Sequence, residues 1–148
     1  MKQDLLEKIT VRLHENATNY SVFLHAYEVP YVQQADSAAL IRTGLGVEAV
    51  LGGVDEVEVG AVCTEVEDAL LYPGDDGAGP GNLVFQNELF IELLNELKGE
   101  IRRLASASFK IERFWLQDGH PAYPVFWDFA FLFWGKDKAT LFIGSSSD

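Results

Sequence analysis

The sequence predicts an α+β fold in a single domain over residues 1–148, in which a C-terminal antiparallel β-meander is packed on one face by a long amphipathic helix. Two observations lead to this prediction. Apolar residues recur at three- and four-residue steps over residues 87–105, which is the periodicity of a helix with one buried face. Three apolar runs separated by turn-rich stretches then fill residues 108–144, as in successive antiparallel strands. Further short helices are expected N-terminal to these elements.

The N-terminal segment has the apolar spacing of a helix. Its apolar residues are separated by polar ones and are Leu5, Leu6, Ile9 and Leu13. This spacing predicts a helix from about residue 2 to residue 15. The aromatic and β-branched run over residues 20–32 suits a strand, although a helix also fits its spacing, and Pro30 interrupts either one.

A short helix is expected next. Asp36 or Ser37 can cap its start, because the side-chain oxygen of either residue accepts a hydrogen bond from a free backbone N–H group. The helix would run through Arg42. Gly44 and Gly46 would then end it, since glycine readily adopts the backbone conformations that follow a helix.

The following segment gives weaker signals. Val57 and Val59 alternate with glutamates, which predicts a strand with the valines on one face. Thr64 would then cap a short helix through Leu71, and Glu67 would complete its capping box. Beyond this helix, the glycine- and proline-rich stretch YPGDDGAGPGN predicts a long loop.

The clearest element is the long helix from about Asn87 to Ala105. Its apolar stripe consists of Leu89, Phe90, Leu93, Leu94, Leu97, Ile101 and Leu104. Glutamates near its start and basic residues near its end suit the helix macrodipole. The three strands that follow are expected over residues 108–116, 125–134 and 139–144, with a hairpin loop between the last two.

One charged residue, Asp128, interrupts the apolar run of the middle strand. The odd-numbered face of this strand is uniformly bulky and is expected in the core under the helix. The even-numbered face is mixed, and Asp128 beside Ala130 would leave a shallow polar notch flanked by Phe126 and Trp134. Three interpretations stay open: an ion pair with a base of the neighbouring strand (Lys110 or Arg113), a binding surface with aromatic anchors, or a catalytic carboxylate. Phe126, Leu132 and Trp134 are expected to be exposed on this face and would need covering, which favours a homodimer assembled through it.

The charge distribution limits the classes of partner. The chain of 148 residues has a formal net charge of −12, and residues 43–97 contain twelve acids and no Lys or Arg. Such a surface repels nucleic acid and anionic membranes and attracts cationic proteins. We therefore expect a cationic protein partner. The expected partner-binding residues are Glu56, Glu58, Glu65, Glu67, Asp68, Asp75, Asp76 and Trp134.

Motifs of known chemistry are missing from the sequence. The three histidines do not have metal-ligand spacing, and the glycine-rich loop carries two aspartates in place of the lysine that a phosphate loop needs. The sequence therefore predicts that the protein is not an enzyme and uses neither a metal nor another cofactor. The alternative is a small-molecule-binding protein, or an enzyme of other chemistry, with a pocket formed by Asp128, His120 and Phe126.

The sequence also indicates a location. The single cysteine, Cys63, cannot form an internal disulfide and fits a reducing compartment. The N-terminus lacks the apolar run of a secretory signal, and the longest apolar run is shorter than the roughly 20 residues of a membrane helix. We expect a soluble cytoplasmic protein. In size, acidity and α+β composition the chain is similar to immunity proteins that block bacterial nuclease toxins, a resemblance of physical type without a shared motif.

Overall fold

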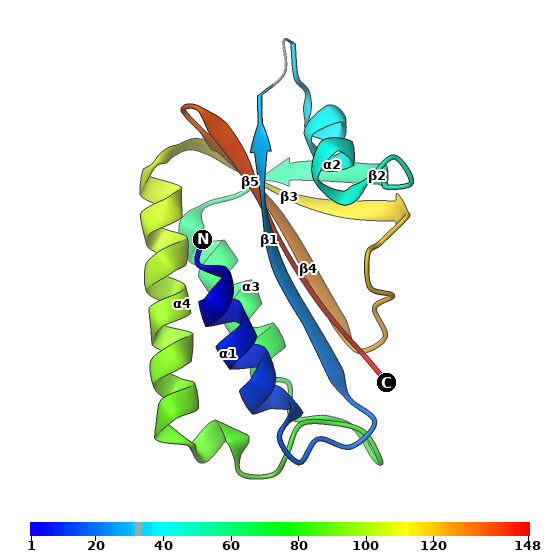
Figure 1. Cartoon of the computed structure of the whole chain (residues 1–148), viewed down its shortest axis with the longest axis vertical. Helices are drawn as coiled ribbons and strands as arrows, with labels where there is room; N and C mark the ends of the chain where they lie inside the picture. Colours follow the sequence, from blue (N-terminus) through cyan, green and yellow to red (C-terminus); the bar gives the residue numbers. More distant parts are fainter. Residues whose placement is uncertain (32–33) are drawn as a thin grey trace.

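The computed structural model describes residues 1–31 and 34–148, and over these residues it contains four α-helices and one five-stranded antiparallel sheet (Figure 1). The helices are α1 (Gln3–His14), α2 (Ser37–Leu45), α3 (Val59–Leu70) and α4 (Glu88–Ser106), with a short 3-10 helix η1 (Val84–Gln86) before α4. The strands are β1 (Ser21–Pro30), β2 (Val50–Glu56), β3 (Ser108–Asp118), β4 (Trp127–Gly135) and β5 (Lys138–Ser147). Their order across the sheet is β1-β5-β4-β3-β2. The predicted α+β class and C-terminal meander are confirmed.

Three of the predicted helices, α1, α2 and α4, form close to their expected positions, and α2 is capped as expected. The side chain of Asn87 accepts hydrogen bonds from the backbone N–H groups of Leu89 and Phe90 at the start of α4. Asp36 accepts one from Ala39 at the start of α2, and Gly46 ends α2 with a φ of 111°, a conformation that glycine adopts without strain. The predicted N-terminal helix is α1.

The ambiguous run over residues 20–32 is strand β1, although its last residue, Val32, lies outside the described residues together with Gln33. β1 is an edge strand that pairs only with β5 among the described strands. Side chains of α1 accept hydrogen bonds from two backbone N–H groups of β1. His14 Nε2 accepts from the N–H of Val22 at 2.8 Å, and Gln3 Oε1 accepts from the N–H of Ala26 at 3.4 Å. An edge protected in this way is less open to pairing with a second chain.

The boundary between β2 and α3 was predicted wrongly. The strand ends at Glu56 and the helix begins at Val59, so Thr64 lies inside α3 and does not cap it. Glu67 forms an ion pair with Lys98 of α4, with Nζ and Oε2 2.6 Å apart, and does not complete a capping box. The local alternation of valine and glutamate resembles a strand, but the valines also begin the apolar stripe with which α3 packs on α4 and the sheet.

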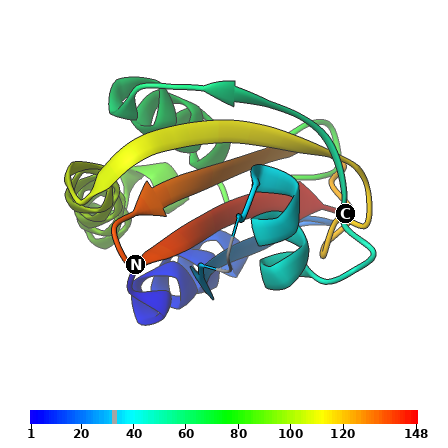
Figure 2. The same ribbon diagram turned by 90° about the horizontal axis from the view of Figure 1, so that it is seen from above.

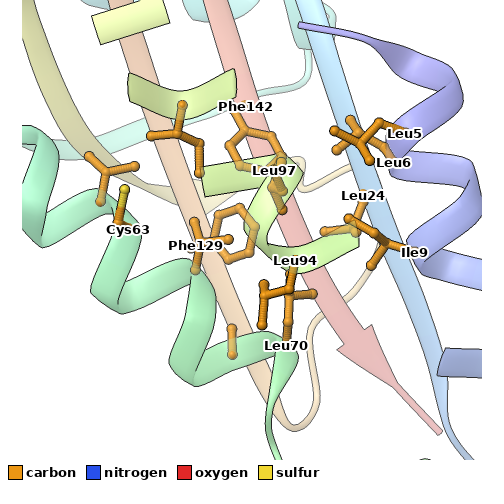
Figure 3. Packing of buried hydrophobic residues seen from close by; sticks show 14 of the residues in the cluster. Leu5, Leu6, Ile9, Leu24, Cys63, Leu70, Leu94, Leu97, Phe129 and Phe142 are labelled. Carbon is orange, nitrogen blue, oxygen red and sulfur yellow. The ribbon is translucent and has the colours of Figure 1, made fainter. Parts of the chain in front are cut away.

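Helices cover both faces of the sheet (Figures 1 and 2). On one face, α1, α3 and α4 pack on the odd-numbered residues of β4, which confirms the predicted core under the long helix. Figure 3 shows Phe129 and Phe142 of the sheet facing Leu94 and Leu97 of α4 and Cys63 of α3. This core is formed by residues that are far apart in the sequence.

On the other face, α2 covers the even-numbered residues of β4. Leu132 is 0% exposed and Trp134 is 9% exposed, and both pack in a second core with Leu40 and Ile41 of α2. The expectation that Leu132 and Trp134 are exposed and need covering by a second copy is therefore wrong. The chain covers them itself, so this face gives no reason to expect a homodimer.

The second core predicts that Leu132→Ala lowers the free energy of unfolding by about 2–5 kcal/mol, because the substitution leaves a cavity in a packed interior. Val47→Ala is the matched control, since the Val47 side chain is 88% exposed and its loss should change stability by no more than about 0.5 kcal/mol. Denaturant unfolding of both variants measures the difference. Equal, small effects would mean that the even-numbered face of β4 is not buried.

Candidate protein-binding surface

The ion pairs of the chain use most of its bases and few of its acids. In residues 1–31 and 34–148, eight of the 11 bases are paired with eight of the 23 acids. Fifteen acids in the same residues therefore have no ion pair. The negative charge of the chain is left on its surface and is available to a partner.

Two of the acids expected to bind a partner are paired inside the molecule. Glu65 of α3 binds Arg113 of β3, whose Nε and Nη2 atoms lie 2.7 Å and 2.6 Å from Glu65 Oε2. Glu67, on the same helix, binds Lys98 as described above. Both ion pairs join α3 to its neighbours, and so these two carboxylates hold the fold together and are less available to a partner.

The other five predicted acids are exposed and form what we call the acidic surface: Glu56, Glu58, Asp68, Asp75 and Asp76. Glu56 and Glu58 lie where β2 passes into α3, and the aspartates lie at the opposite end of α3 and in the loop that follows it (Figure 1). Asp75 accepts a hydrogen bond from the Tyr72 hydroxyl at 3.1 Å. A shallow hollow of about 320 Å³ at the start of α3 brings Glu56 and Glu58 near Arg102 and Lys110, so the strongest unopposed charge lies toward the aspartates.

Trp134, the predicted aromatic anchor, is part of the second core. Its indole N–H donates to Glu112 Oε1 at 2.7 Å, and Lys110 Nζ lies 4.5 Å from the ring centroid. Glu112 is a buried carboxylate that also accepts from the Ser37 hydroxyl at the start of α2, at 2.7 Å. The Glu112 carboxylate thus connects α2 to the sheet and is hydrogen-bonded to Trp134, so Trp134 has a structural role.

Asp128 is exposed at the start of β4, opposite Ser145 of β5. Of the three interpretations of Asp128, the ion pair with Lys110 or Arg113 is wrong. In the antiparallel register Lys110 pairs with Trp134 and Arg113 with Phe131. Both bases therefore lie opposite residues farther along β4 than Asp128. They bind Glu112 and Glu65 instead.

The structure brings His120 near Asp128 but separates both from Phe126. His120 lies in the β3–β4 connection, and its Nδ1 accepts from the backbone N–H of Ala122 at 3.0 Å. The neutral ring therefore carries its proton on Nε2, which is buried and has no hydrogen-bond partner in the described residues. Burial lowers the pKa of His120, and the nearby carboxylate of Asp128 opposes this shift. Phe126 packs against Tyr20 and Tyr72 in a separate aromatic cluster.

Two larger hollows lie beside α1. One, of about 610 Å³, lies between α1 and α4 and is lined by Val11, Leu89 and Leu93 among charged residues. The other, of about 590 Å³, is bounded by Arg12 and the loop before η1. Neither is lined by a residue of the predicted ligand pocket. None of the hollows described is therefore the predicted ligand pocket of Asp128, His120 and Phe126.

The sequence interpretation missed Trp115 of β3. Its side chain is 47% exposed and lies against Gly52 and Gly53 of β2. Two neighbouring glycines in a strand are a signal of close approach by another group, but only the register of β2 and β3 shows which side chain approaches them.

The described part of the chain holds no group of three or more His, Cys, Asp or Glu side chains able to bind a metal ion. Among the helices of residues 1–31 and 34–148, none combines the length and the apolar character needed to cross a membrane. Comparison of the chain with protein-family models, curated proteins and solved structures gives no match.

The His120 site predicts a pH dependence of stability. Because burial favours the neutral ring in the folded state, the unfolded chain binds a proton more readily, with a pKa of about 6.5. Stability is then lost as the pH falls through and below that value. We expect His120→Gln to flatten this acid-side loss when thermal midpoints are measured between about pH 7.5 and pH 5. Identical pH profiles for the two proteins would contradict the buried position of the ring.

Proposed function

We propose that this protein binds a cationic protein through its acidic surface. One observation supports this proposal. Most bases form ion pairs within the molecule, whereas the five carboxylates of the acidic surface are exposed and form no ion pair with the described residues. A surface with charges of one sign speeds association with an oppositely charged partner and disfavours binding of proteins with the same charge.

An immunity-type role is one form of this proposal, in which the cationic partner is a nuclease toxin. A nuclease carries a basic surface to hold the phosphates of nucleic acid, and an acidic protein can compete for that surface. In this form the protein acts in the cytoplasm, neither binds nucleic acid or membrane nor catalyses a reaction, and requires no cofactor. The single cysteine is buried and free, which is compatible with a reducing compartment.

The alternative proposal is a small-molecule site beside Asp128. The unpartnered Nε2 of His120 is the observation in its favour, since a ligand acceptor could satisfy this N–H group. Against it, the hollows described above lie elsewhere, and Phe126 points to a different cluster. A metabolite screen in which a compound raises the thermal midpoint of the wild type, but not of His120→Gln, would favour the alternative.

Charge reversal tests the acidic surface. We expect the triple variant Glu58→Lys, Asp68→Lys and Asp76→Lys to bind a labelled nona-arginine peptide on the order of ten-fold more weakly than the wild type. Fluorescence anisotropy at about 150 mM salt measures the affinity, since screening at this ionic strength removes weak long-range attraction. The three residues are exposed and accept no side-chain hydrogen bond from the described residues, so the fold should be retained.

The matched control reverses three exposed acids elsewhere: Glu7, Asp137 and Asp148. It changes the net charge by the same amount, so it separates a local surface from a general effect of charge. A clearly smaller loss of affinity in the control supports the acidic surface. Equal losses in the two triple variants, or binding that does not depend on salt, would refute it.

A further inference from the structure

Trp115 of β3 is the most exposed of the three tryptophans in the chain. Strand alternation places its side chain on the same face of β3 as Arg113, and Arg113 reaches Glu65 of α3. Trp115 therefore lies on the α3 side of the sheet, near the edge formed by β2. Nearly half of the residue is accessible to solvent.

The indole is held in place by the two glycines of β2. A Cβ atom added at Gly52 would lie 2.5 Å from Trp115 Cδ1, and one added at Gly53 would lie 2.3 Å from Cζ2. Such distances mean that the ring lies directly on the backbone of β2, in space that any other residue would fill. A β-bulge at this point shifts the register so that Gly53 pairs with Trp115. One side of the ring is thus packed, and its orientation is set before any partner binds.

Two exposed carboxylates, Asp55 and Asp68, lie on the same side of the sheet as the ring. Asp55 is exposed and pairs in register with Arg113, so it lies diagonally across from Trp115 at a Cα distance of about 7–8 Å. Asp68 lies one helical turn beyond Glu65 on the same side of α3. The positive charge of Arg113 is neutralised by Glu65. The surroundings of the ring are therefore negative overall.

We propose that Trp115 is the anchor of a site for an arginine side chain of the cationic partner. The guanidinium group stacks on the free face of the indole while the carboxylate of Asp55 accepts a hydrogen bond from it. This inference rests on the proposed function and adds to it the residue and the chemistry of recognition. An indole face attracts a cation through the ring quadrupole, and arginine is the cation that most often takes this position. A fixed ring also loses little conformational freedom on binding.

The site replaces the predicted anchor, Trp134, with a residue that has the required exposure. Contact with the Trp115 ring explains why β2 contains the consecutive glycines Gly52 and Gly53, although glycine weakens a strand. The pair is needed for the ring to approach the backbone. A tryptophan that is exposed, oriented and bordered by carboxylates has the features of a binding hot spot.

The test titrates the full-length protein with a nona-arginine peptide at about 150 mM salt and measures both the affinity and the intrinsic tryptophan emission. We expect Trp115→Ala to weaken binding about 5- to 30-fold and Trp115→Phe to weaken it less. The emission of the wild type should change on binding, and this change should be absent in Trp115→Phe, because Trp127 and Trp134 donate to partners within the fold and do not meet the peptide.

Two controls make the result specific. Tyr123→Ala removes another exposed aromatic residue, 82% accessible and in the β3–β4 connection, and should leave the affinity unchanged. Gly53→Ala keeps the tryptophan but displaces its ring, so it should weaken binding if orientation matters. Thermal midpoints are recorded for each variant, so that loss of folding is not mistaken for loss of binding.

The outcomes separate this inference from the proposed function. If the wild type does not bind the peptide at all, the acidic-surface proposal fails and the anchor fails with it. If the wild type binds with salt-dependent affinity, but Trp115→Ala binds equally well and the wild-type emission does not change, then the anchor alone is wrong. A loss of affinity that is the same in Trp115→Ala and Tyr123→Ala would also overturn it.

Discussion

The rest of the structure depends on the burial of β4 from both faces. Phe131 and Phe133 on one face and Leu132 on the other are 0% exposed, so the strand needs a helical layer on each side. Three helices supply the first layer and α2 supplies the second. From Phe129 to Trp134 the strand is apolar and buried, as expected of a strand covered on both faces, and this part of it cannot be offered to a partner. Recognition is therefore confined to the outer surfaces of helices, to loops and to the edges of the sheet.

The second layer also determines how the charges are used. α2 is short, and the buried carboxylate of Glu112 connects its first residue, Ser37, to Trp134 of β4. Lys110 lies near this carboxylate, and Arg113, on the same strand, binds α3 through Glu65. These bases stabilise the packing of helices on the sheet and are not available to balance the exposed acids. The excess negative charge on the surface thus follows partly from how the layers are joined, and Trp115 is a large aromatic side chain exposed on the α3 side of the sheet.

The sequence predicted the elements whose signals are local. The apolar stripe of α4, the caps of α2 and the turns of the meander depend on residues within a few positions of each other. What it did not predict depends on distant contacts. The even-numbered face of β4 was predicted to be exposed because Asp128 lies on it. Asp128 is exposed only because it lies at the uncovered start of the strand, and α2 covers the rest of that face. The start of α3 was misplaced because alternating valines and glutamates fit a strand as well as a helix. Trp115 was passed over for Trp134 because exposure depends on the register of β2 with β3.

Quenching of tryptophan emission by caesium and iodide ions measures whether Trp115 is exposed in a negative surface while Trp134 is covered. We expect caesium to quench a minor component of the emission, because carboxylates on the same side of the sheet as Trp115 attract the cation, and iodide to quench it much less. Trp115→Phe should remove this component. Equal quenching by both ions, or a quenched component that remains in Trp115→Phe, would mean that Trp115 is not exposed in a negative surface.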